Sequence, residues 1–189
     1  MFAIDESSGV VTTLTKLDRE LVDVHYFRVI ATDDSFPPRS GTTTLQINVV
    51  DANDHSPVFE SESYEATVRE GVAIGTVIIT VRATDQDINR NAEIEYSLST
   101  SIEEFHIDGK TGVVTTRKAL DRESTPQYSL TVIASDNAPV GDRRTATAAL
   151  RIKILDDNDN YPQFTERTYT VTVPEDFDAT VNPLVASVK

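Results

Sequence analysis

The sequence contains no cysteine and no tryptophan, and its basic residues are few beside its acidic ones. Without cysteine the chain can form neither a disulfide framework nor a thiolate metal site. The absence does not indicate whether the protein occupies an oxidising or a reducing compartment. With 17 basic against 31 acidic residues and a net charge of −14, the chain lacks the clustered cations that phosphate binding requires, which excludes nucleic acid as a partner. The acidic excess is compatible with simple solubility or with cation binding, and the placement of the acids has to decide between them.

Long apolar runs and helical periodicity are also missing. No stretch approaches the ~20 apolar residues of a membrane span, and no signal peptide opens the chain, so we expect any anchor of a parent protein to lie outside it. No Asn-x-Ser/Thr sequon occurs, so N-glycosylation is not expected here. No segment shows a sustained period of 3.6 residues, which argues against a helical fold.

What the sequence does contain is a repeat about one small domain in length. The stretch from Phe2 to Glu20 matches the stretch from Phe105 to Glu123 at an offset of 103, and "DANDHSPVF" matches "DDNDNYPQF" at an offset of 105. An interval of this length is the size of a whole domain rather than of a helical solenoid unit. We therefore expect a piece of a longer array: residues 1–54 as the later half of one repeat, 55–159 as a complete repeat, and 160–189 as the first part of a third.

Within the complete repeat the apolar residues alternate with polar ones. Alternation with one polar face is typical of a two-layer antiparallel sandwich, and about seven short strands in ~100 residues favour an immunoglobulin-like one without its Cys–Trp–Cys hallmark. The predicted fold class is thus all-β: tandem immunoglobulin-like Greek-key β-sandwiches, one complete and two partial. The residues predicted to face inward are Val77, Ile79, Val81, Ala83, Ile94, Tyr96, Leu98, Leu130, Val132, Ala134, Ala146, Ala148, Leu150, Ile152 and Ile154.

The acids gather where strands are expected to end. "DAND" follows one predicted strand and "DDND" follows its counterpart a repeat later. Clustered carboxylates repel each other, and a hard cation such as Ca²⁺, which takes six to eight oxygen ligands, relieves that repulsion. Turn chemistry alone explains any single motif, since Asn and Asp suit turns. The recurrence of all the motifs at domain spacing favours the cation, and no stretch has the spacing of an EF-hand loop.

The signatures "LDRE", "DxND(N/H)xPxF", "ATDQD" and "VREG" resemble those of cadherin repeats and extend over the whole chain. The wider patterns around "ANDHSPVFE" and "DDNDN" are most similar to the seven-pass Flamingo/Celsr-type cadherins. The resemblance implies a tandem array of sandwiches with three Ca²⁺ ions at each joint between domains. Asp-x-Asn-Asp would be that joint, and the proline after it would start the next domain without offering a backbone donor.

The resemblance also implies ligands for each joint. Side chains would bind the ions except at Ala52, His55, Asn91, Asp157 and Asn160, which would offer their backbone carbonyls; His55 stands where the family pattern has Asn. Acids that match ligands of joints outside this chain, Asp33 and Glu175, would be unused. The ligands of the first joint would be Asp18, Glu20, Asp51, Ala52, Asn53, Asp54, His55, Asp85, Asp87, Asn91 and Asp136. Those of the second joint would be Glu70, Asp121, Glu123, Asp156, Asp157, Asn158, Asp159 and Asn160.

Two functional classes follow. The first is calcium-dependent cell–cell adhesion on the extracellular side of the plasma membrane, with other cadherin ectodomains as homophilic partners and no small-molecule substrate. Its variant is a passive Ca²⁺-stiffened spacer in a heterophilic Fat-, Dachsous- or protocadherin-type receptor. The second class is a Ca²⁺-dependent enzyme, but the three histidines stand apart from any candidate nucleophile and no Gly-x-Ser-x-Gly elbow occurs; they are His25, His55 and His106.

Overall fold

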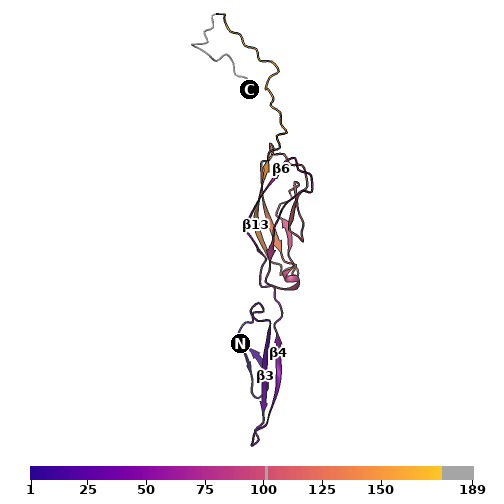
Figure 1. Ribbon diagram of the computed structural model, residues 1–189. Coiled ribbons are helices and arrows are strands. Elements are labelled where there is room, and N and C mark those ends of the chain that lie inside the picture. The colour runs from indigo at the N-terminus through magenta and orange to yellow at the C-terminus, as the bar shows by residue number, and fades with distance from the viewer. Residues whose placement is uncertain (101, 176–189) are drawn as a thin grey trace. The chain divides into compact units, whose positions relative to one another are not determined.

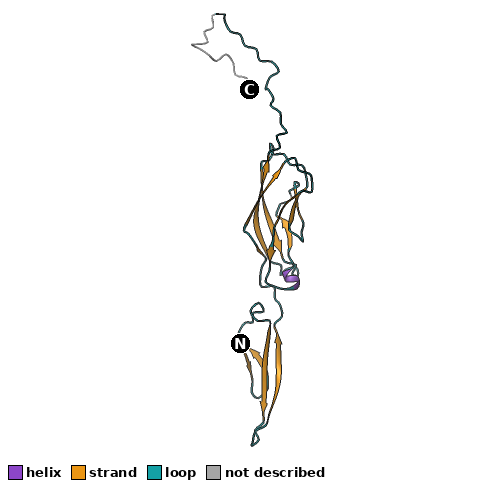
Figure 2. Ribbon diagram, viewed as in Figure 1, coloured by secondary structure: helices purple, strands orange, loops and turns teal. Residues whose placement is uncertain are grey.

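The computed structural model describes residues 1–100 and 102–175, which fall into two compact units, residues 1–155 and residues from 156 onward. Strands dominate the first unit, and the one helical segment among the described residues is a short 3-10 turn (Figure 2). The elements are β1 (Phe2–Ile4), β2 (Val11–Thr13), β3 (Val24–Thr32), β4 (Ser40–Asn48), β5 (Val58–Phe59), β6 (Ser63–Arg69), β7 (Val77–Thr80), β8 (Ala83–Thr84), η1 (Asn89–Ala92), β9 (Glu95–Leu98), β10 (Phe105–Ile107), β11 (Val113–Thr116), β12 (Gln127–Ser135) and β13 (Thr145–Leu155).

Strands β5 to β13 form a β-sandwich. One sheet has the order β6-β13-β12-β9 and the other the order β10-β11-β7, with a short β5–β8 pair beside them. Strand β6 runs parallel to β13, as Figure 1 shows, and every other pair in these sheets is antiparallel. The predicted all-β sandwich class is confirmed.

The core lies between these two sheets, because the alternating apolar residues turn inward from both. In β13 each second residue from Ala148 to Ile154 is buried while its neighbours are exposed. Phe105 of β10 is buried and meets Tyr128 of β12 edge to face, with 4.8 Å between the ring centroids. Such edge-to-face contacts add to the free energy gained by burial. Other core residues are Val68, Val81, Tyr96, Ile107, Val114, Leu120, Leu130, Val132, Ala134, Leu150 and Ile152.

One predicted inward position is wrong. Val77 is 61% exposed, whereas Ile78 packs partly buried against the core. The cause is a β-bulge in the β7–β11 pairing: Thr115 opposes Val77 and Val114 opposes Ile79, which leaves Ile78 without a partner residue. An inserted residue reverses the alternation on one side of the bulge, so the faces of β7 exchange there.

Residues 1–54 form two hairpins that repeat those of the sandwich. β1–β2 pairs Phe2 with Thr13, as β10–β11 pairs Phe105 with Thr116, and β3–β4 corresponds to β12–β13. His25 contacts Phe2 edge to face at 5.1 Å, at the position that Tyr128 has in the complete repeat. The internal repeat in the sequence is therefore a repeat of structure, and His25 has a packing role.

The second unit is described by residues 156–175, and none of these residues lies in a strand or a helix. In that range the rings of Phe164 and Tyr169 contact each other, with centroids 6.2 Å apart. The expected third repeat extends to residue 189, and residues 176–189 lie outside the described residues. Among the described residues of the chain, no helix is long and apolar enough to cross a membrane.

Candidate metal centre

The first acidic motif lies between β4, which ends at Asn48, and β5, which begins at Val58. Pro57, fully buried, marks the entry into the sandwich, where a residue without a backbone donor is tolerated. We call residues 51–55 the first joint. Three loops of the first unit bring acids to it: the loop that holds Glu20, the loop after β8 and the loop after β12.

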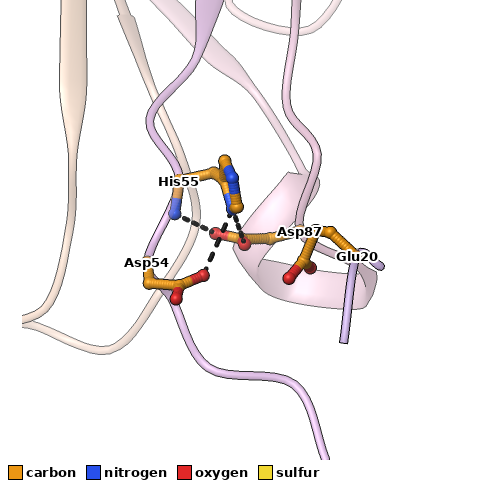
Figure 3. Close-up of side chains that lie close together, drawn as sticks. All are labelled: Glu20, Asp54, His55 and Asp87. Atoms are coloured by element: carbon orange, nitrogen blue, oxygen red, sulfur yellow. Dashed lines mark hydrogen bonds and ion pairs between the residues drawn. The ribbon is translucent and has the colours of Figure 1, made fainter. Parts of the chain in front are cut away.

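Four side chains meet at one side of the first joint. Ligand atoms of Glu20, Asp54, His55 and Asp87 all lie within 4.8 Å of one another. Figure 3 shows the imidazole of His55 between the carboxylates of Asp54 and Asp87. Its Nδ1 lies 3.2 Å from Oδ1 of each, and its backbone N–H donates to Oδ2 of Asp87 at 3.2 Å.

The electrostatics of this cluster reflect both burial and neighbouring negative charge. Burial raises the pKa of Asp87, as do the charges of Asp85 and Asp51, although two hydrogen bonds from His55 oppose the shift. Burial by itself would lower the pKa of His55, but the hydrogen bond to Asp87 and the neighbouring carboxylates outweigh it and raise the pKa. The raised pKa of Asp87 thus reflects burial first and neighbouring carboxylates second, and that of His55 reflects its hydrogen bond to Asp87 and the negative charges around it.

Asp51 lies beside the guanidinium of Arg19. Its Oδ1 is 2.7 Å from Nε of Arg19, a close contact of opposite charges that lacks the alignment of a hydrogen bond. Its Oδ2 accepts hydrogen bonds from Nδ2 of Asn91 at 3.0 Å and from the N–H of Ile88 at 3.3 Å. Oδ2 therefore ties residues 1–54 to the turn η1 of the following repeat, while Oδ1 contacts an arginine from its own side of the joint.

Asn53 reaches to the loop after β12. Its Nδ2 donates to Oδ2 of Asp136 at 3.0 Å and to the carbonyl of Asp142. Arg144 contacts the same two residues. Its Nε donates to the carbonyl of Asn53 at 2.9 Å and its backbone N–H donates to Oδ2 of Asp136 at 2.9 Å. Because the amide nitrogen of Asn53 donates to this loop, its Oδ1 remains available to bind another group.

Several acceptor oxygens in or beside the first joint lack an aligned hydrogen-bond donor among the described residues. Oδ1 of Asn53 and Oδ2 of Asp85 are buried and accept no hydrogen bond from any described residue, and Oδ1 of Asp51 accepts only the unaligned contact with Arg19. Buried acceptors without partners cost free energy. Carboxylate and amide oxygens are the ligands that Ca²⁺ prefers, so the donor set fits a calcium ion.

A second acidic group lies at the other end of the complete repeat. Oxygens of Glu70, Asp121 and Glu123 lie within 4.8 Å of one another, and Glu70 is buried. Oε2 of Glu70 accepts the N–H of Arg122 at 2.7 Å. Hydrogen bonds from the hydroxyl and the N–H of Ser124 lower the pKa of Asp121, which favours its ionised form.

The second joint, residues 156–160, belongs to the second unit. Asn158 has a positive φ of 52°, a conformation that asparagine tolerates better than most residues, and its N–H lies 3.3 Å from Oδ1 of Asp156. Asn160 donates from Nδ2 to Asp159 at 2.8 Å. Local turn contacts thus shape this motif.

The remaining predicted ligands have local contacts. Oδ1 of Asp18 accepts the N–H of Leu21 at 2.9 Å, which fixes the loop that presents Glu20. The carbonyl of Ala52 accepts the N–H of Asp54 at 2.8 Å. The carbonyl roles of Ala52, His55, Asn91, Asp157 and Asn160 stay predictions.

Two basic residues that contact the first joint were not predicted from the sequence. Arg19 lies between the two acids of "LDRE", and its position next to two predicted ligands was the available signal. Arg144 lies in no recognisable motif, and its contact with Asn53 spans 91 residues of sequence. No local pattern could therefore indicate this contact.

Comparison with known proteins gives the same family throughout. The Cadherin domain family matches residues 1–50 and 64–155. Mouse cadherin-23 EC22-24 superimposes with a TM-score of 0.82 at 38% identity over 87% of this chain and 53% of that chain. Protocadherin gammaB7 EC3-6 superimposes with a TM-score of 0.78 at 31% identity over 89% of this chain and 42% of that one.

Curated relatives are far longer than this chain. The Protocadherin-like wing polarity protein stan of Drosophila melanogaster is 59% identical over 188 residues, which is 93% of this chain and 5% of the relative. The human Cadherin EGF LAG seven-pass G-type receptor 2 is 46% identical over 180 residues, 93% of this chain and 6% of the relative. The resemblance to the Flamingo/Celsr-type cadherins seen in the motifs is confirmed. With the family match, the sandwich and the repeated hairpins in agreement, the chain belongs to the cadherin family.

Proposed function

We propose that this chain is an extracellular segment of a membrane-anchored protein that mediates calcium-dependent cell–cell adhesion, and that its joints bind Ca²⁺. The observation that carries the proposal is a set of buried acceptors without donors in and beside the first joint. They are Oδ1 of Asn53 and Oδ2 of Asp85, near the ion-paired Asp51. Oxygens of this kind are stabilised by a hard cation and are costly without one.

At the first joint, the bound ions would supply positive charge and a fixed geometry. Residues from both sides of the joint would share the ions: Glu20 and Asp51 come from residues 1–54, and Asp87 and Asp136 come from the following repeat. Neutralising these carboxylates together removes their mutual repulsion and resists bending between the domains. Calcium binding is proposed likewise for Glu70, Asp121 and Glu123, and separately for residues 156–160 of the second unit.

The domain boundaries at residues 54 and 159 belong to this proposal. The family match to residues 1–50 and 64–155 and the recurrence of the hairpins at matching offsets support them. A rigid array would hold recognition surfaces at a defined reach from the membrane. The carboxylates then serve ion binding, and we propose no enzymatic role for them.

Homophilic contact with other cadherin ectodomains is the finer part of the proposal. It rests on the relatives, one named for wing polarity and others named as seven-pass receptors. We propose that the parent of this chain acts in planar cell polarity between neighbouring cells. No nucleic acid or small-molecule substrate enters this function.

Bead aggregation tests the adhesive role. Beads that carry the 189-residue chain are mixed with differently coloured beads that carry an unrelated sandwich domain, in millimolar Ca²⁺ or in chelator. Homophilic adhesion predicts clusters of one colour that form with Ca²⁺ and disperse on chelation. Clusters that ignore chelation contradict the proposal.

A chain that serves only as a stiffened spacer gives a different result. Beads that carry such a chain stay dispersed. Small-angle scattering of the free chain still shows a narrower distribution of molecular dimensions when Ca²⁺ is added. That outcome retains calcium binding and removes the homophilic part.

A further inference from the structure

Arg19 contacts the first joint and residues on both sides of it. Its Nη2 donates to the carbonyl of Gln86 at 3.0 Å and pairs with Oε1 of Glu20, and its Nε lies 2.7 Å from Oδ1 of Asp51. Only 13% of the side chain is exposed, and the contact with Gln86 crosses 67 residues of sequence into the following repeat. One guanidinium therefore holds the upstream loop, the joint and the downstream repeat together.

These contacts use atoms that the calcium ions need. Asp51 and Glu20 are both proposed ligands, and the remaining oxygen of Asp51 is already engaged by Asn91 and Ile88. A guanidinium and a Ca²⁺ ion cannot both lie against Oδ1 of Asp51, because like charges at that separation repel strongly. Arginine stays protonated at any physiological pH, so loss of its proton cannot release the site.

We propose that Arg19 is a tethered counter-cation of the first joint: it bridges Glu20, Asp51 and Gln86 when calcium is absent and must be displaced before calcium binds. The inference rests on the proposed calcium function. It gives the joint two ordered arrangements, one held by an internal cation and one held by ions from solution. Arg19 then lowers calcium affinity while it preserves contact between the repeats in the calcium-free chain.

The opposite expectation holds for a purely structural residue. If Arg19 only shaped the ligand loop, its removal would loosen Glu20 and weaken calcium binding. If it competes with calcium, removal strengthens binding. The sign of the change in affinity therefore separates the two roles.

A matched control exists at the same joint. Nζ of Lys16 lies 3.7 Å from Oδ2 of Asp54, with 89% of the lysine side chain exposed. Replacing Lys16 removes the same unit charge without vacating the oxygens of Asp51. Exposed pairs of this kind contribute little, so a change in net charge alone predicts a small effect for Lys16→Gln.

The experiment is a calcium titration of the full chain and of its Arg19→Gln and Lys16→Gln variants. Binding is monitored through the amide resonances of Gln86 and Ile88. We expect half-saturation of the first joint at about threefold to tenfold lower Ca²⁺ for Arg19→Gln, and less than about twofold lower for Lys16→Gln. In chelator, we expect faster hydrogen exchange at Gln86 and Ile88 in the Arg19 variant alone.

Three results would overturn the inference. If the Arg19 variant binds calcium no more tightly than the unmodified chain, Arg19 does not compete with calcium. An equal gain in both variants shows a general effect of charge. Failure of the unmodified chain to respond to Ca²⁺ removes the proposed function as well, and so is distinguished from the first two results.

Discussion

Nδ2 of Asn53 donates a hydrogen bond to Oδ2 of Asp136 at 3.0 Å, between residues that stand 83 apart in the chain. Asp136 is 1% exposed and also accepts the backbone N–H of Ala138 at 3.1 Å and of Arg144 at 2.9 Å. A buried carboxylate with three donors is a structural support for the joint before any ion is bound.

The first prediction concerns this support. Replacement of Asp136 by alanine leaves the N–H groups of Ala138 and Arg144 without an acceptor, which should lower the free energy of unfolding by about 3 kcal/mol. Urea denaturation in chelator measures the loss without any contribution from calcium. Asp136→Asn keeps one acceptor oxygen and should lose about half as much; a loss near zero in both variants would contradict the supporting role.

The second prediction concerns the turn between β10 and β11. Gly112 has a φ of +68°, and a Cβ there would lie 2.3 Å from the carbonyl oxygen of Val81. Gly112→Ala should therefore cost about 3 kcal/mol or more, the sum of a left-handed backbone and an unavoidable overlap. Thermal unfolding of the variant and the unmodified chain measures this loss of stability.

Gly75 is the matched control for this turn. Its φ is +88°, but nothing lies within 4 Å of the position a Cβ would take. Gly75→Ala should cost only the backbone strain, about 1–2 kcal/mol. Equal losses in the two variants would show that the close approach of Val81 does not matter.

Much of the sandwich could be predicted from the sequence because burial on one face of a strand enforces alternation. Strands β12 and β13 pair in regular register over nine positions, and their inward residues are those predicted. Val77 was mispredicted because a bulge arises from pairing with β11, and a strand's own alternation does not encode its partner. The short turn η1, which presents Ile88 and Asn91 to Asp51, has no periodicity to reveal it either.

The candidate site divides in the same way. Acids at strand ends are visible in sequence as recurring motifs, and the structure gathers Glu20, Asp54 and Asp87 within 4.8 Å. The basic residues that contact the same joint were not predicted. Arg19 and Arg144 act through partners 67 and 91 residues away, and a long flexible cation can reach many acids, so sequence alone does not select one.

The third prediction separates two neighbours in the first joint. Asp54 is proposed to bind calcium through its charged side chain, and His55 through its backbone carbonyl, which any residue provides. Asp54→Ala should weaken calcium binding about tenfold or more, because ligand charge sets affinity in such sites. His55→Ala should change it less than about threefold. Isothermal titration of each variant measures this, and equal weakening would refute the assignment.

The fourth prediction concerns pH at a turn away from the proposed ions. The side-chain and backbone hydrogen bonds from Thr111, with that from Lys110, lower the pKa of Asp108. A carboxyl whose folded pKa is depressed stabilises the fold above its unfolded pKa, and this contribution is lost as pH falls through the folded pKa.

Thermal unfolding of Asp108→Asn beside the unmodified chain checks the pH effect. The variant should melt lower at about pH 7, and the difference should shrink as the pH falls below the ordinary range of aspartate, about 3.9. A difference that stays constant from pH 7 to about pH 3 would show that the charge of Asp108 does not stabilise the turn.

Calcium binding at the joints is the central claim, and a calcium titration of the 189-residue chain by calorimetry, with melting temperatures in millimolar Ca²⁺ and in chelator, tests it most directly. Extracellular calcium modules bind at roughly 10⁻⁴–10⁻³ M, so we predict half-saturation in that range and a clear rise in melting temperature with Ca²⁺. A chain that shows no binding heat and melts at the same temperature in calcium and in chelator would contradict the account.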